Sequence, residues 1–138
     1  VGGNGSAADI IGVLNGIFYN DASTLKPTFA NFYKATITPA NSEDTTAFVI
    51  DDPFQQYVVG ADAATGVTTM LETYDMNTSA GSDTTGKSSS TLDIGTTSQD
   101  GKQFRMLRSA EDPENEDATA VRHSVVVVSN LNSFNGHN

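Results

Sequence analysis

The sequence predicts an all-β fold, either a single antiparallel β-barrel or a jelly-roll-like β-sandwich with long polar loops. The clearest signal is an apolar run from Thr46 to Ile50, a stop at Asp51-Asp52-Pro53, and a run from Phe54 to Val59. The second run alternates with the period of two that a pleated strand requires, and Pro53 forces a bend or a sheet edge. Seven or eight such short runs, separated by turn residues at fairly regular spacing, favour one barrel or sandwich.

Strands are also expected in the first 42 residues. Ile10 to Tyr19 is apolar but contains Gly12 and Gly16, which predict bulges or a close approach of another chain segment. Residues 20–23 form a turn signal, Phe29 to Ala35 is aromatic and predicted to be extended, and residues 39–42 close that segment.

The middle of the chain is less regular. Val67, Met70, Leu71 and Tyr74 recur at helical spacing. The sequence is therefore compatible either with one helical turn between Gly66 and Asn77 or with no helix there. Thr78 to Ser90 is rich in Ser, Thr, Gly and Asp and predicts a loop.

The last third holds the strongest strand. Leu92 to Ile94 is a short strand at best, and Gln99 to Lys102 is a hairpin-like turn that leads into a strand from Phe104 to Arg108. After the acidic loop Glu111 to Asp117, Val121 to Val128 is apolar on both faces, which predicts a strand covered on both sides.

Length and charge restrict the function. A chain of 138 residues predicts one domain, here residues 10–138, preceded by a flexible Gly-rich arm at residues 1–9. The 17 acids against seven bases give a net charge of −10, which argues against nucleic-acid binding. There is no cysteine for a disulfide, no apolar run long enough to suggest a membrane span, and no visible signal peptide.

The titratable residues give no specific catalytic or metal pattern. We expect His123 to be a half-exposed strand residue, and His137 lies one residue from the chain end. Asp51 and Asp52 point to opposite faces if extended, so a turn beside Pro53 is favoured over an acid pair or calcium site. The loop Glu111 to Asp117 lacks the spacing of a specific calcium loop, which favours a solvated acidic loop over weak calcium binding.

Gly81 to Ser88 formally matches the phosphate-binding pattern Gly-x-x-x-x-Gly-Lys-Ser. The mechanism requires a buried strand before the loop and a helix after it, and neither flank has that character, so no nucleotide is expected at Lys87. Asn4 and Asn77 begin glycosylation sequons, to which we give low weight. The sequence therefore predicts no catalytic, cofactor or metal residues, and no enzyme.

Several segments, in this order, resemble a family of small head decoration (cement) proteins of tailed bacteriophages. Each segment is unspecific alone, and the order carries the resemblance over most of the chain. The segments are Ile11 to Tyr19, Pro27 to Tyr33, Ala47 to Pro53, Val58 to Asp62, Tyr74 to Asn77, Thr84 to Ser88 with Leu92-Asp93, Arg105 to Arg108, and Asn115-Glu116 before the valine strand. The family usually carries further sequence on the N-terminal side.

The resemblance implies a non-enzymatic virion protein that binds the major capsid protein on the capsid exterior as a homo-oligomer. A trimer would match a capsid threefold axis, and the faces of Val125 to Val128 would suit a subunit interface. Removing residues 1–9 is then expected to weaken shell binding more than folding. The alternative is a β-sandwich adhesion module that binds carbohydrate or uses calcium, which exposed Phe29, Phe32 and Tyr33 on one flat face would favour.

Overall fold

The computed structural model describes residues 10–34, 36–41, 45–96, 101–114, 117–121 and 123–130. The arm predicted at residues 1–9 lies outside these ranges. The prediction of an all-β fold is confirmed: the described residues form nine strands in antiparallel sheets and two short 3-10 helices. In these ranges the sheets do not close into a barrel, and the arrangement is consistent with a β-sandwich. No described helix is long and apolar enough to cross a membrane.

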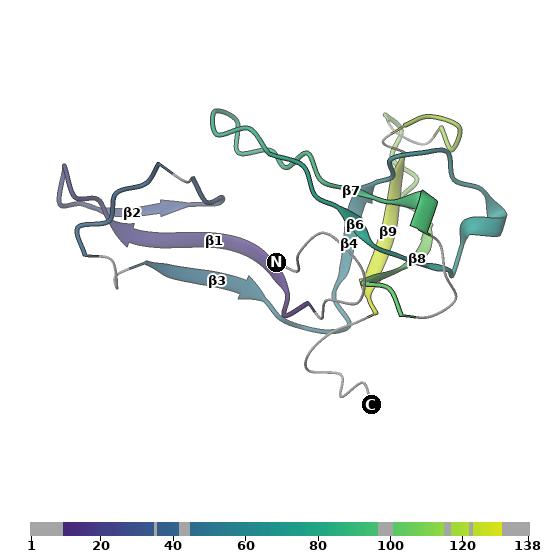
Figure 1. Ribbon diagram of the computed structural model, residues 1–138, viewed down its shortest axis with the longest axis horizontal. Coiled ribbons are helices and arrows are strands. Elements are labelled where there is room, and N and C mark those ends of the chain that lie inside the picture. The colour runs from purple at the N-terminus through teal and green to yellow at the C-terminus, as the bar shows by residue number, and fades with distance from the viewer. Residues whose placement is uncertain are drawn as a thin grey trace.

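The first three strands of the chain form a three-stranded sheet with the order β2-β1-β3, at one end of the molecule (Figure 1). Its strands are β1 (Val13–Asn20), β2 (Pro27–Ala30) and β3 (Thr46–Ile50). The register between β1 and β3 shifts between Leu14 and Gly16, which is the irregularity that the glycine predicted. A side-chain Cβ at Gly12 would collide with the carbonyl oxygen of Ile50, so Gly12 marks a close approach of the chain before β1 to β3.

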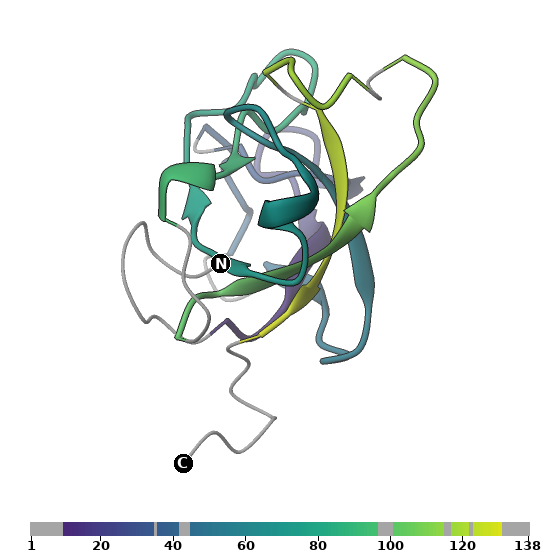
Figure 2. The ribbon, with the colours of Figure 1, turned by 90° about the vertical axis from the view of Figure 1, so that its right-hand side faces the viewer.

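The rest of the chain forms a four-stranded sheet with the order β4-β9-β8-β5 and a separate pair, β6-β7 (Figure 1). The bounds are as follows: β4 (Gln56–Gly60), β5 (Thr73–Tyr74), β6 (Met76–Asn77), β7 (Thr91–Leu92), β8 (Phe104–Ser109) and β9 (Ser124–Ser129). A parallel bridge between Ala61 and Leu92 attaches the β6-β7 pair to the end of β4. Viewed end-on, the strands and loops of this half surround a common interior (Figure 2).

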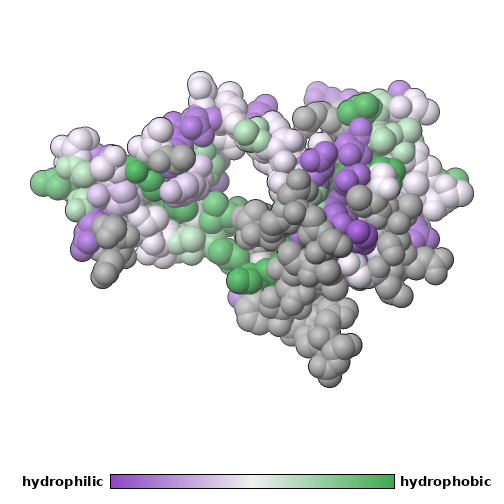
Figure 3. Space-filling view, in the orientation of Figure 1, coloured by the Kyte–Doolittle hydropathy of each residue, from purple (hydrophilic) through white to green (hydrophobic). Residues whose placement is uncertain are grey.

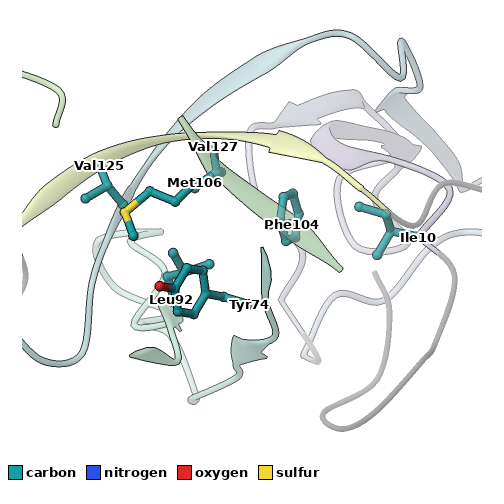
Figure 4. Packing of buried hydrophobic residues seen from close by; sticks show 7 residues of the cluster. All are labelled: Ile10, Tyr74, Leu92, Phe104, Met106, Val125 and Val127. Carbon is teal, nitrogen blue, oxygen red and sulfur yellow. The ribbon is translucent and has the colours of Figure 1, made fainter. Parts of the chain in front are cut away.

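The hydrophobic core lies inside this second half (Figure 4). Its buried cluster consists of Ile10, Tyr74, Leu92, Phe104, Met106, Val125 and Val127. Tyr57 packs edge-on against Phe104 with ring centroids 6.4 Å apart. The valine strand β9 is central in its sheet and buried along most of its length, as its apolar residues on both faces predict.

The structure changes several details of the sequence interpretation. The helical spacing after Gly66 gives only a 3-10 turn, η1 (Val67–Thr69), because Thr73–Tyr74 pairs with β8 instead of continuing the helix. A second 3-10 turn, η2 (Ile94–Thr96), follows β7. The strand expected from Phe29 to Ala35 is Pro27–Ala30, displaced toward the turn before it.

The pairing of the strands adds two observations. β7 pairs with β6 while β8 pairs with β5 and β9, so the turn expected at Gln99 to Lys102 does not join two partners of one hairpin. Gln99 and Asp100 themselves lie outside the described residues. The two runs around Pro53 are strands, as predicted, but they enter different sheets because the chain turns sharply between them. In that turn the Asp52 carboxylate accepts a hydrogen bond from the amide of Phe54 at 2.8 Å.

Candidate interaction surface

Three phenylalanines form an exposed patch on one face of the three-stranded sheet, which we call the aromatic face: Phe18, Phe29 and Phe48. Phe18 lies directly opposite Phe29 in the β1-β2 register, and Phe48 lies opposite Gly16 in the β1-β3 register. Because directly paired residues and residues two apart in a strand share a face, all three side chains stand on the same side. Phe29 is 62% exposed, Phe48 46% and Phe18 36%. Figure 3 shows hydrophobic atoms reaching the surface over this half of the molecule.

Gly16 allows the aromatic face to form. The Phe29 and Phe48 rings meet across β1 with centroids 6.0 Å apart and an angle of 50° between their planes. A Cβ at Gly16 would come within 2.6 Å of the Phe29 ring, so a larger residue there would push the rings apart. The glycine thus lets two aromatic side chains from opposite edge strands cover the central strand.

On the opposite face of the same sheet, two side chains of β1 are buried. Ile17 is 2% exposed and Tyr19 8%, so β1 alternates between a buried and an exposed side. Residues 34 and 36–38 line one pocket together with Tyr19 of this side, and just beyond them the amide of Ala40 donates to the carbonyl of Asn20. Over β1 the aromatic face is therefore the more exposed side, whereas on β3 Val49 of the opposite side is 43% exposed as well.

An acidic corner lies at the end of β3. Asp51 and Asp52 are both exposed, and the Tyr57 hydroxyl donates to the carbonyl of Ile50 at 3.5 Å. Burial raises the pKa of Tyr57, and the negative charges of Asp52 and Asp51 raise it further. The turn role predicted beside Pro53 is confirmed for Asp52 by the hydrogen bond described above.

A cleft of about 490 Å³ separates the two halves of the molecule. It is lined mainly by the start of β1, by Phe32 and Tyr33, by the tip of the 78–90 loop, and by Phe104 from the core. Figure 3 shows the surface hollowed at this position. The Phe32 ring is in contact with Gly86 at the loop tip, so the loop bridges from the second half to the first.

The residues with candidate chemistry stay apart. His123 is not the half-exposed strand residue we expected: it is 1% exposed and directly precedes β9. Asp117 nearby is exposed, and its pKa is lowered by the Thr119 hydroxyl and amide, with a smaller effect of His123. Asp75 is buried and forms an ion pair with Lys102 at 2.8 Å, which compensates the charge of its carboxylate beside the core.

The phosphate-loop match has the wrong surroundings for a nucleotide. β6 precedes it and β7 follows it, so the loop is the connection of an antiparallel strand pair. Inside it, the amide of Ser82 donates to the carbonyl of Lys87, and the amide of Gly86 donates to the carbonyl of Ser82. These two amides are therefore occupied within the loop, and Lys87 is exposed.

The described part of the acidic loop behaves as a polar turn. Asp112 accepts a hydrogen bond from the amide of Glu114 at 3.1 Å. Among the described residues, no three His, Asp or Glu side chains are grouped as metal ligands would be. Asn77 of the second sequon is exposed in β6. His137, Asn4, and Asn115-Glu116 within the loop lie outside the described ranges.

Sequence reasoning singled out Phe29 but not its partners Phe18 and Phe48. The alternation within Thr46 to Ile50 was visible, but it could not show that Phe48 crosses Gly16 to meet Phe29, since this depends on the register between distant segments. Phe32 is half-buried against Gly86, whereas Tyr33 is 57% exposed. Comparisons of the chain with family models, curated proteins and solved structures found no match.

Proposed function

We propose that this chain is a virion structural protein: a decoration, or cement, protein that binds the outer surface of a bacteriophage capsid shell and stabilises it. The aromatic face is the observation that carries the proposal. A contiguous exposed apolar patch on a folded domain marks an interaction surface more often than a solvated one. The resemblance of the ordered segments to phage decoration proteins gives the identity of the partner, the major capsid protein.

The mode of action follows from this assignment. The protein acts by binding alone, without catalysis and without a cofactor, and it gains avidity when several copies engage a symmetric shell. A homotrimer on a capsid threefold axis is the favoured assembly. The net charge of −10 keeps free copies soluble and argues against nucleic acid as the partner.

The test uses purified capsid shells from which the decoration layer is missing. Added protein should co-sediment with the shells at a fixed stoichiometry and raise the temperature at which they disassemble. Phe48→Ser should weaken shell binding at least about tenfold, as expected for an aromatic residue at the centre of a contact. Val67→Ser is the matched control, because Val67 is 89% exposed but lies in η1, outside the aromatic face.

Two results would contradict the proposal. One is an absence of saturable binding to any decoration-depleted shell by the folded protein. The other is binding that Phe48→Ser and Val67→Ser weaken equally, because the aromatic face would then have no particular role. Electron microscopy of the complexes would show whether bound copies lie on threefold axes.

A carbohydrate-binding or adhesion module is the second candidate, because exposed Phe29 stands on a sheet face as that reading requires. The 50° angle between the Phe29 and Phe48 rings does not give the flat platform on which a sugar ring stacks. Saturable binding to a defined glycan, weakened by Phe29→Ala, would favour this candidate over the capsid role.

A further inference from the structure

The outer edge of β3 has no hydrogen-bonded strand among the described residues. In the described residues the sheet order gives β3 one hydrogen-bonded neighbour, β1. Its sequence, Thr46–Ile50, contains no charge and no proline, and its first four residues are exposed. Natural proteins usually protect an edge strand with charged side chains, proline or a covering segment. β2, at the other edge of the sheet, begins with Pro27.

The charges around β3 indicate which kind of strand this edge accepts. Exposed Asp51 and Asp52 follow it directly. A second copy paired in parallel through the same edge would bring Asp51 and Asp52 beside the same two residues of the copy. Like-charge repulsion opposes that arrangement, whereas a segment with Lys or Arg at this end would be attracted to the two carboxylates.

We propose that β3 is a docking edge for an extended segment of a partner protein, with apolar residues at alternate positions and Lys or Arg at its ends. The segment would add a fourth strand to the sheet through main-chain hydrogen bonds, the mode known as β-augmentation. Its apolar side chains on one face would stand beside Phe48 and extend the aromatic face, while one of its basic ends would meet the acidic corner. This inference rests on the proposed function insofar as it places the segment in the shell protein.

The direct test uses a synthetic probe with the full-length protein. The probe is a fluorescent peptide Lys-Lys-Val-Thr-Val-Thr-Val-Lys-Lys, compared with a version that has Glu in place of every Lys and one with Pro at the central Val. We expect saturable binding of the basic peptide that weakens with salt, and binding at least about tenfold weaker for both others. Hydrogen exchange should show new protection of amides in β3, with β9 as the unchanged internal reference.

Variants test the charge term separately from folding. Asp51→Asn with Asp52→Asn should weaken peptide binding about threefold to tenfold, because the acidic corner is neutralised while Asn can still accept the hydrogen bond at the turn. Asp83→Asn, an exposed acid in the 78–90 loop, is the matched control and should leave binding unchanged. Equal binding of all three peptides, no binding of the basic peptide, or protection that appears outside β3 would overturn the proposal.

The same reagents separate this inference from the proposed function. If the protein binds shells, but neither excess basic peptide nor the double Asp→Asn variant affects that binding, the β3 docking edge is wrong and the decoration role stands. If the peptide binds β3 but shells do not bind the protein, the decoration role is wrong and the docking edge stands.

Discussion

The two halves of this molecule use apolar residues in opposite ways. The four-stranded sheet turns Tyr74, Phe104, Met106, Val125 and Val127 into its cluster, which also includes Leu92 from the separate β6-β7 pair. The three-stranded sheet buries Ile17 and Tyr19 on one side and leaves its phenylalanines on the other. One half thus supplies the core that stabilises the fold, and the other presents a surface available for contacts.

Charge follows the same division. The first 50 residues contain four acids and two bases, whereas the remaining 88 contain 13 acids and five bases. The residues after position 50, which include the acidic corner at Asp51 and Asp52, therefore carry a net charge of −8, and the first 50 carry −2. Since a desolvated contact is opposed by unpaired charge, a weakly charged apolar sheet is the better candidate for an interface core. We therefore expect that substitutions in the two sheets would alter stability and the proposed binding separately.

The largest expected effect is a loss of stability in the half of the molecule that contains the core. Val127 is 1% exposed in the central strand, so Val127→Asp would bury a carboxylate among apolar neighbours and should destabilise the fold by at least about 3 kcal/mol. Val58→Asp in the adjacent β4 is the control: Val58 is 66% exposed, and we expect a loss below about 1 kcal/mol. Urea unfolding followed by circular dichroism measures both. Equal stability of the two variants would mean that β9 is not the centre of the core.

An intermediate loss of stability is expected in the three-stranded sheet, where the chain before β1 approaches the edge strand β3. Gly12→Ala places a methyl group against the main-chain carbonyl of Ile50 and against Val49, which should cost about 1–3 kcal/mol because the backbone has to shift. Gly66→Ala is the matched control, since nothing lies within 4 Å of its Cβ position and its φ of −151° is open to alanine. Hydrogen exchange should show lost protection in β1 and β3 while β9 stays protected. Uniform loss over both halves would instead indicate that the two sheets unfold as one unit.

The sequence predicted the parts of this comparison that depend on local patterns. The alternation of β4, the burial of β9 on both faces and the irregularity near Gly16 all follow from neighbouring residues, and each was confirmed. The turn at Asp52 was predicted for the same reason, because Asp before Pro favours a bend that its own carboxylate can cap.

The remainder depends on contacts between distant segments. No local pattern predicts that β3 and β4, on the two sides of Pro53, belong to different sheets. Nor does one predict that β7 pairs antiparallel with β6, from which a long loop separates it. Burial of His123 likewise depends on what packs over the start of β9, not on its neighbours in the sequence. The aromatic face depends on the register of three strands and on the absence of a side chain at Gly16. The sequence pattern therefore indicated only one of its three residues, Phe29.

The smallest expected effects come from the loop that touches both halves. Lys87→Ala removes an exposed side chain and should change the free energy of unfolding by no more than about 0.5 kcal/mol, with no effect on ATP binding because none is expected. Gly86→Ala, one residue earlier, should cost more, about 1 kcal/mol, because Gly86 has a φ of +68° and is in contact with the Phe32 ring. Thermal unfolding of both variants, with calorimetric titration of ATP, gives the comparison. A Lys87→Ala effect larger than that of Gly86→Ala, or ATP binding that Lys87→Ala abolishes, would show that the lysine has a binding role and that the loop is more than a bridge between the sheets.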